Sequence, residues 1–203
     1  MWRGVYTFSR TLNTKLTVEL SEAGKAIEER LRKGGTPFVV TGLDVLMGFV
    51  QHQPERILHI VYTAEGTTDW VQSNLRGQKL IPLIDPSKAE IENVLASSDN
   101  EVVIIRQRYS PIAVYENRAT KERAFVDLYY ETTRELIPFP LQEVAYIFEN
   151  MRAASLINSV QMIRYAHERK LDSEIRSIWE FPKGKAVTKR QVKSFLAALR
   201  AIQ

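Results

Sequence analysis

Residues 36–108 change repeatedly between two patterns of apolar and polar positions, which predicts alternating strands and helices. Continuous apolar runs predict strands that are covered on both faces of a sheet, and the clearest of them is Val102-Val103-Ile104-Ile105. Amphipathic stretches between these runs predict helices. Strands are expected at 38–41, 57–62, 80–84 and 101–108, and helices at 43–51, at about 67–77 and from Asp85-Pro86 onward. This order predicts an α/β fold, on the border of α+β, with a central sheet flanked by helices.

Two further elements are predicted before this region. Residues 2–9 alternate between apolar and polar side chains, as a short strand does. A helix is expected over about 21–33, because Ser21 can cap its first turn and Gly34-Gly35 can end it.

The last third of the chain has a helical pattern only. Helices are predicted at 119–133, at about 141–150, at 156–169 and at 172–179, followed by a short linker over 181–187. A final helix is expected from Thr188, which forms a capping box with Gln191. The chain is therefore divided into one α/β domain over 1–180 and a basic linker and helix over 181–203. The apolar stripe of the final helix consists of Val192, Phe195, Leu196, Leu199 and Ile202, which span about 120° of the helix.

Composition narrows the class of protein. The chain has 203 residues, of which 44% are apolar and 26% charged, as in an ordinary globular domain. It contains no cysteine, which excludes disulfides, thiolate metal sites and a cysteine nucleophile, and which fits a reducing cytoplasm. Neither a secretory signal pattern nor an apolar run of membrane-spanning length occurs, so we expect no membrane partner.

Charge is distributed unevenly along the chain. The net charge is +4, yet residues 181–203 alone carry six basic and no acidic side chains, so the excess lies at the C-terminus. The nearly neutral body argues against a broad nucleic-acid surface, whereas the tail could contact an anion. We prefer a final helix that docks on its own domain with a solvated basic side; contacts with DNA, a partner protein or a second copy in a homodimer are the alternatives. The candidate contact residues are Lys183, Lys185, Lys189, Arg190, Lys193 and Arg200.

Known catalytic and cofactor motifs are missing. His52 and His59 lack the spacing of metal ligands, and the sequence contains no HExxH, no glycine-rich phosphate loop, no GxSxG and no Asp-x-Asp pair. His167 falls on an apolar stripe with Leu156, Val160, Ile163 and Leu171, so we interpret it as a histidine at the core boundary. We expect neither a metal nor a cofactor, and no enzymatic activity.

The helix predicted at 119–133 contains the most concentrated charge. Arg123 and Asp127 are four residues apart and can pair on one face of the helix. Glu122 and Asp127 are five apart, about 140° around the helix, so their side chains diverge. We therefore favour a structural role for these residues over an acid–base pair.

Three segments resemble, in the same order, three motifs of one known protein family. Residues 46–54 resemble a Leu-x-x-Phe-x-x-His-Gln-Pro segment that contains His52. Residues 120–129, with Glu122, Arg123 and Asp127, resemble a Thr-Leu-Glu-Lys-Ile-Leu-Val-Asp-Leu-Tyr helix in which Lys121 here replaces leucine and Arg123 replaces lysine. Asn158 and then residues 164–169, which end at Arg169, resemble an Asn…Tyr-Ala-x-x-Arg stretch. These motifs are those of the AbiEi family, the antitoxins of type IV toxin–antitoxin systems, and the resemblance covers about 36–180.

The resemblance implies a non-catalytic domain that counters a toxin resembling a nucleotidyltransferase or helps to regulate its operon. Such antitoxins carry an N-terminal winged helix that reads the operator; here residues 3–8 resemble the last strand of a wing, without the recognition helix. The chain is therefore expected to be a fragment or a member that has lost its DNA reader. Two alternatives stay open: a DNA-associated transcriptional regulator that uses the basic tail, and, least favoured, an enzyme on a nucleotidyltransferase-like scaffold.

Overall fold

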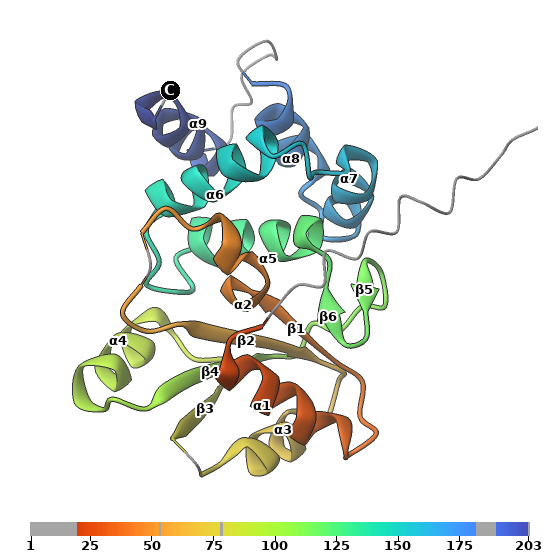
Figure 1. Ribbon diagram of the computed structural model, residues 1–203, viewed down its shortest axis with the longest axis vertical. Helices are drawn as coiled ribbons and strands as arrows, with labels where there is room; N and C mark the ends of the chain where they lie inside the picture. Colours follow the sequence, from red (N-terminus) through yellow and green to blue (C-terminus); the bar gives the residue numbers. More distant parts are fainter. Residues whose placement is uncertain (1–19, 53, 78, 182–189, 203) are drawn as a thin grey trace, which may run out of the picture.

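The computed structural model of the chain describes residues 20–52, 54–77, 79–181 and 190–202. The strand predicted at 2–9, the cap at Thr188, and Lys183, Lys185 and Lys189 lie outside the described residues. Within them the α/β prediction is confirmed, because a six-stranded mixed sheet is covered by helices and the C-terminal part is helical (Figure 1).

The sheet has the strand order β3-β4-β2-β1-β6-β5, with β1 (Phe38–Gly42), β2 (Leu58–Thr63), β3 (Leu80–Ile84), β4 (Glu101–Arg106), β5 (Val114–Tyr115) and β6 (Arg118–Ala119). β4 pairs in parallel with both β2 and β3, whereas β1 runs antiparallel to β2 in the interior of the sheet. On the far side of β1, β6 pairs in parallel with β1 and antiparallel with β5.

Helices form one layer below the sheet and two layers above it in Figure 1. α1 (Glu22–Arg32) and α3 (Thr68–Leu75) cover the lower face, while α5 (Lys121–Thr133) and the short α2 (Leu43–Leu46), continued by the 3₁₀ turn η2 (Met47–Phe49), lie above it. α4 (Lys88–Ser97) lies at the end of the sheet formed by β3 and β4. The upper layer consists of α6 (Leu141–Ala153), α7 (Ser159–Glu168), α8 (Asp172–Trp179) and α9 (Arg190–Ile202).

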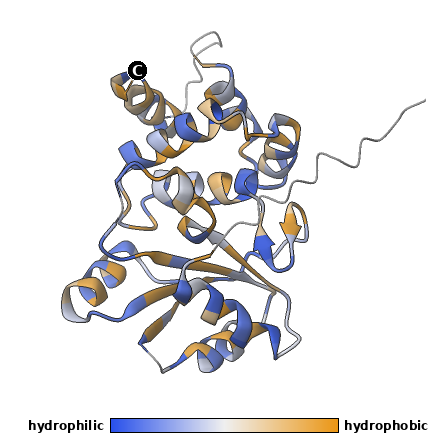
Figure 2. Cartoon of the chain, viewed as in Figure 1, coloured by the Kyte–Doolittle hydropathy of each residue, from blue (hydrophilic) through white to orange (hydrophobic). Residues whose placement is uncertain are grey.

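The apolar runs of the sequence form the centre of this sheet. Val102, Val103, Ile104 and Ile105 are all buried on β4, which lies between β2 and β3, so the prediction of a strand covered on both faces is confirmed. Figure 2 shows the same concentration of hydrophobic residues along the central strands. None of the helices in the described part of the chain is long and apolar enough to cross a membrane.

Two local predictions need correction. The fourth helix begins at Lys88 rather than at Asp85-Pro86, because Ser87 caps it and forms a reciprocal capping box with Glu90. Asp85 cannot belong to the helix, since its φ is +42°. The β5–β6 hairpin was not predicted from its Glu116-Asn117 turn; both turn residues have positive φ, and each strand is only two residues long.

The final helix packs into the core of the preceding domain, as the docked interpretation predicts. Val192, Phe195 and Leu199 are fully buried on α9, which packs mainly against α6. The Phe195 ring lies 5.3 Å from the Tyr129 ring and 6.3 Å from the rings of Phe125 and Phe148, measured between centroids. Residues on α5, α6 and α9 therefore share one aromatic cluster.

Candidate functional site

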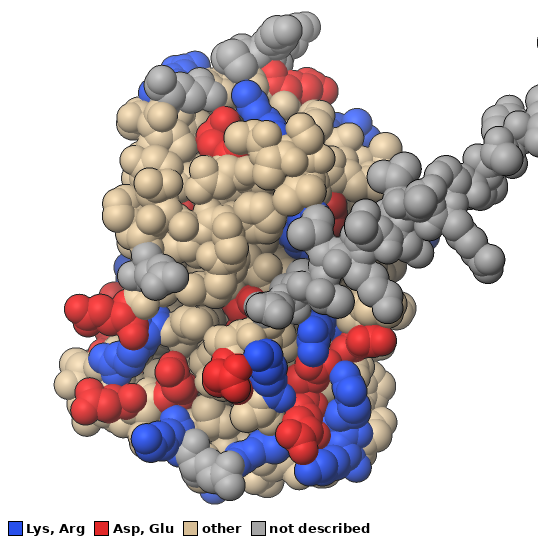
Figure 3. Space-filling model, viewed as in Figure 1, with Lys and Arg blue, Asp and Glu red and all other residues tan. Residues whose placement is uncertain are grey.

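Helix α5 carries its charged side chains into the interior of the protein. Arg123, Asp127 and Glu131 follow one another at intervals of four residues on one helical face, and none of them is exposed. This face lies between the sheet and the upper helices, so each charged group must find its partners inside the protein. The side chains of this charge network are buried, whereas Lys, Arg, Asp and Glu residues lie mixed over the lower part of the surface that Figure 3 shows.

Asp127 is enclosed by partners from three elements. Its Oδ2 accepts a hydrogen bond from Thr41 Oγ1 on β1 at 2.8 Å and lies 3.4 Å from Arg123 Nε. Its Oδ1 accepts from the Tyr165 hydroxyl on α7 at 2.6 Å and lies 3.7 Å from Arg169 Nε. Burial raises the pKa of Asp127, while the two guanidinium groups and the two hydroxyl donors favour the charged form. The predicted pair of Arg123 and Asp127 is confirmed.

Arg123 also fastens the loop that follows β4. Its Nη1 donates to the carbonyl oxygens of Ser110 and Ile112 at 2.6 and 2.7 Å, and its guanidinium carbon lies 4.7 Å from the centroid of the Tyr165 ring. Arg123 has no exposed surface, and through these contacts it connects α5 to α7 and to the loop.

Glu131 occupies the next position of the network, at the ends of β2 and β4. It accepts hydrogen bonds from the Tyr62 hydroxyl at 2.9 Å and from Arg106 Nε at 3.2 Å. Arg106 donates further to the carbonyl oxygens of Pro86 and Leu136. Glu131 thus connects α5 to residues at the carboxyl ends of two parallel strands.

A third buried carboxylate, Glu174 on α8, accepts from the Tyr129 hydroxyl at 3.0 Å and from both terminal nitrogens of Arg134 at 3.0 and 3.2 Å. Glu122, in contrast, accepts from the backbone N–H of Asn158 just before α7 at 2.9 Å. Glu122 and Asp127 therefore have separate partners, and the prediction that they diverge is confirmed.

One edge of the network is partly open to solvent. The guanidinium carbons of Arg108, Arg134 and Arg169 lie 4.5, 5.0 and 4.6 Å from the centroid of the Tyr130 ring. Their side chains are 28%, 25% and 13% exposed, respectively. Of these four residues only Arg169 was singled out from the sequence, because Tyr130 and the other arginines come from elements that only the fold brings together.

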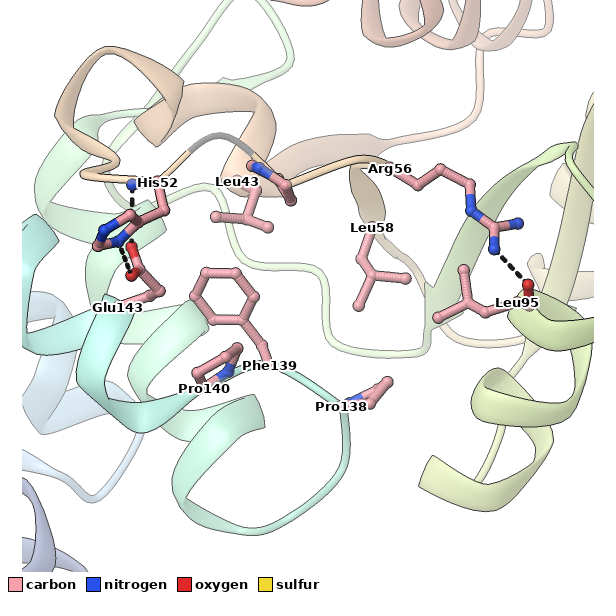
Figure 4. A pocket seen from close by; sticks show the side chains of 10 residues that line it. Leu43, His52, Arg56, Leu58, Leu95, Pro138, Phe139, Pro140 and Glu143 are labelled. Atoms are coloured by element: carbon pink, nitrogen blue, oxygen red, sulfur yellow. Dashed lines mark hydrogen bonds and ion pairs between the residues drawn. The ribbon is translucent and has the colours of Figure 1, made fainter.

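A separate groove lies between α4 and the start of α6 (Figure 4). At one end His52 Nδ1 lies 2.6 Å from Glu143 Oε1, and the His52 side chain is 71% exposed. At the other end the Arg56 guanidinium donates to the carbonyl oxygens of Leu95 and Ser98. The groove has a volume of about 390 Å³, and its apolar lining includes Leu43, Leu58, Leu95 and Phe139.

His59, which the sequence analysis considered only as a metal ligand, lies buried on β2. His59 Nδ1 is 2.7 Å from Asp44 Oδ2, and neither side chain is exposed; His59 Nε2 lies 3.5 Å from Glu101 Oε2. Burial opposes a charge on His59, but Asp44 and Glu101 outweigh it and raise the pKa to about 9. Ser21 also donates to Asp44, so this group ties the start of α1 to β2.

This elevated pKa leads to a pH-dependent stability. Protonated His59 stabilises the fold fully below its unfolded pKa of about 6.5, and the contribution is lost as the pH rises through the folded pKa of about 9. We expect the difference in unfolding free energy between the wild type and His59→Gln to shrink over this range in urea titrations. A difference that is constant from pH 6.5 to 9 would show that His59 is not charged in the folded protein.

The prediction for His167 is wrong. Its side chain is 81% exposed, Val160 on the same expected stripe is 75% exposed, and the buried face of α7 is formed by Met162, Tyr165 and Ala166 instead. His167 Nδ1 lies 3.8 Å from Asp172 Oδ1 at the surface.

The three basic residues of α9 do not join the charge network. Arg190, Lys193 and Arg200 are exposed on α9, and the Arg200 guanidinium lies 5.6 Å from the centroid of the Phe181 ring. No group of three potential metal-ligating side chains occurs in the part of the chain that the structure describes.

A family model described as a family of unknown function, DUF6577, matches residues 1–183. Neither the curated proteins nor the solved structures contain a significant match.

Proposed function

The chain belongs to the DUF6577 family, whose function is unknown, and we propose that it is a non-catalytic, antitoxin-like regulatory domain of the cytoplasm. In this proposal it counters a toxin that resembles a nucleotidyltransferase, or helps to regulate the toxin's operon. The partner is inferred from the resemblance of residues 46–54, 120–129 and 158–169 to AbiEi-type antitoxins.

The observation that carries the proposal is the enclosure of the motif carboxylates. Asp127 has no exposed surface and four internal partners, and Glu122 is 4% exposed and bonds the backbone of Asn158. A general acid or base must reach the proton of a substrate, directly or through one water. These side chains instead hold α5, α7 and β1 together, which suits a binding domain.

We place the toxin contact at the groove of Figure 4. His52 and Pro54 belong to the first motif and line this groove, whereas Leu46 of the same motif is buried in the core. The exposed part of the motif is thus the part that core packing does not require. An apolar groove with a histidine–carboxylate pair and an arginine at its ends suits a protein segment with an apolar centre and polar flanks.

Co-expression with a nucleotidyltransferase-like toxin of the kind that AbiEi-type antitoxins counter tests the proposal. We expect the wild type to restore growth that the partner alone arrests. His52→Glu should weaken the rescue, because it places a second carboxylate next to Glu143 in the groove. His167→Glu is the matched control, since His167 is equally solvated and also lies beside a carboxylate, but on α7.

Failure of the wild type to restore growth would contradict the antitoxin proposal. Equal rescue by the wild type and His52→Glu would instead move the contact away from the groove.

A DNA-associated regulator is the second candidate, and the exposed basic side of α9 favours it. Arg190, Lys193 and Arg200 could contact a phosphate backbone while the apolar side of the helix stays in the core. Duplex binding that falls steeply with salt and is lost in a Lys193→Gln, Arg200→Gln double variant would support this function. If the double variant instead changes the mass in solution, α9 contacts a second copy of the chain.

A further inference from the structure

The open edge of the charge network lies at the carboxyl ends of two parallel neighbours, β2 and β4. The chain leaves β2 through α3 toward β3, whereas it leaves β4 toward β5 and β6 on the other side of β2. In open α/β sheets, ligands bind outside the carboxyl ends of the strands. Tyr62 and Arg106, near the ends of β2 and β4, belong to this edge.

Positive charge exceeds negative charge in the network. Three carboxylates, of Asp127, Glu131 and Glu174, face five guanidinium groups, and Asp85 adds an outer contact to Arg106 at 3.6 Å from a half-exposed position. The five arginines are Arg106, Arg108, Arg123, Arg134 and Arg169. At least one positive charge is therefore left over.

The excess is located at Arg108 and Arg169. Arg106, Arg123 and Arg134 make hydrogen bonds to carboxylates within the network. The Arg108 guanidinium lies 4.0 Å from Glu131 and Arg169 Nε lies 3.7 Å from Asp127, both beyond hydrogen-bond distance. Arg169 Nη2 donates to the Tyr62 hydroxyl at a long 3.5 Å. Arg169 Nε is buried without a hydrogen-bond acceptor, which is costly for a charged donor.

Both groups are held in place by the same aromatic ring. The guanidinium carbons of Arg108 and Arg169 lie 4.5 and 4.6 Å from the Tyr130 centroid, so neither needs to be ordered when a ligand arrives. Planar guanidinium groups with free donors match the oxygens of a phosphate, which they can bind in pairs.

We propose that Arg108 and Arg169 bind the phosphate group of a small phosphorylated ligand at the carboxyl ends of β2 and β4. Tyr130 orients the two guanidinium groups, and each of them also lies within 4.0 Å of a buried carboxylate, Glu131 or Asp127. This site is distinct from the groove assigned to the toxin and does not depend on the proposed function.

Calorimetric titration of the full chain with inorganic phosphate, at constant ionic strength set by chloride, tests the site. We expect saturable binding that Arg108→Gln weakens about tenfold or more, since it removes one charge-assisted contact. Arg108→Gln is the main test variant, because the Arg108 side chain is 28% exposed and its replacement should leave the fold intact. Arg169→Gln should weaken phosphate binding by a similar factor, provided that this variant folds. Arg164→Gln, an exposed arginine of α7, is the control and should bind as the wild type does.

Several outcomes would overturn the assignment. They are the absence of saturable phosphate binding by the wild type, and unchanged affinity in Arg108→Gln. Loss of binding in the Lys193→Gln, Arg200→Gln variant would place the anion on α9. If the wild type binds duplex DNA but not phosphate, and Arg108→Gln abolishes the DNA binding, the ligand of this site is a nucleic acid and not a small phosphorylated molecule.

Discussion

Replacing Asp127 with asparagine should lower the free energy of unfolding by about 3–5 kcal/mol, the cost of removing one partner from a buried ion pair. Both carboxylate oxygens accept hydrogen bonds or face a guanidinium group: Oδ2 faces Thr41 and Arg123, and Oδ1 faces Tyr165 and Arg169. In either orientation of the asparagine amide, its NH₂ group would face hydrogen-bond donors and a guanidinium group instead of an acceptor. Arg123, which has no exposed surface, would also lose its charge partner.

Urea unfolding of the wild type and Asp127→Asn measures this effect. Asp69→Asn, on the exposed surface of α3, is the control and should change stability by less than about 0.5 kcal/mol. A loss below about 1 kcal/mol in Asp127→Asn would show that the network is not a structural centre of the fold.

Replacing Phe195 with alanine should destabilise the protein by about 3–5 kcal/mol. The ring is fully buried, and its centroid lies 5.3–6.3 Å from those of three other rings, so its removal leaves a cavity among Phe125, Tyr129 and Phe148. The same argument predicts that truncation after residue 181 exposes this cluster, because α9 covers it.

Denaturation monitored by near-ultraviolet circular dichroism reports directly on this aromatic cluster. Lys193→Ala, an exposed substitution on the same helix, should leave both the spectrum and the midpoint nearly unchanged. A truncated chain that unfolds at the wild-type midpoint would mean that α9 is an appendage and not part of the core.

The strands and most helices could be predicted because local patterns determine them. The run Val102–Ile105 is buried on both faces, and only a central strand provides such an environment. The rotation of α7 could not be predicted, because an apolar stripe through Val160 and Ile163 competes with Tyr165, which turns inward to reach Asp127. The hydrogen bond to a residue 38 positions earlier in the chain decides which face is buried.

The candidate site was predictable only where its partners are close in sequence. Arg123 and Asp127 are one helical turn apart, so their pairing follows from spacing. Asp44 and His59, or Arg169 and Tyr130, lie on different elements, and only the strand order and helix packing bring them together. The composition could not predict these pairs, because it does not distinguish charged residues that become buried from those that stay exposed.

The most direct test of a non-catalytic domain is a turnover measurement on purified protein with labelled nucleoside triphosphates and Mg²⁺ or Mn²⁺. We expect the wild type, Glu122→Gln and Asp127→Asn to give the same background signal, while Asp127→Asn alone loses several kcal/mol of stability. Transfer of label by the wild type that disappears in a folded Glu122→Gln or Asp127→Asn variant would contradict the account and identify these carboxylates as catalytic.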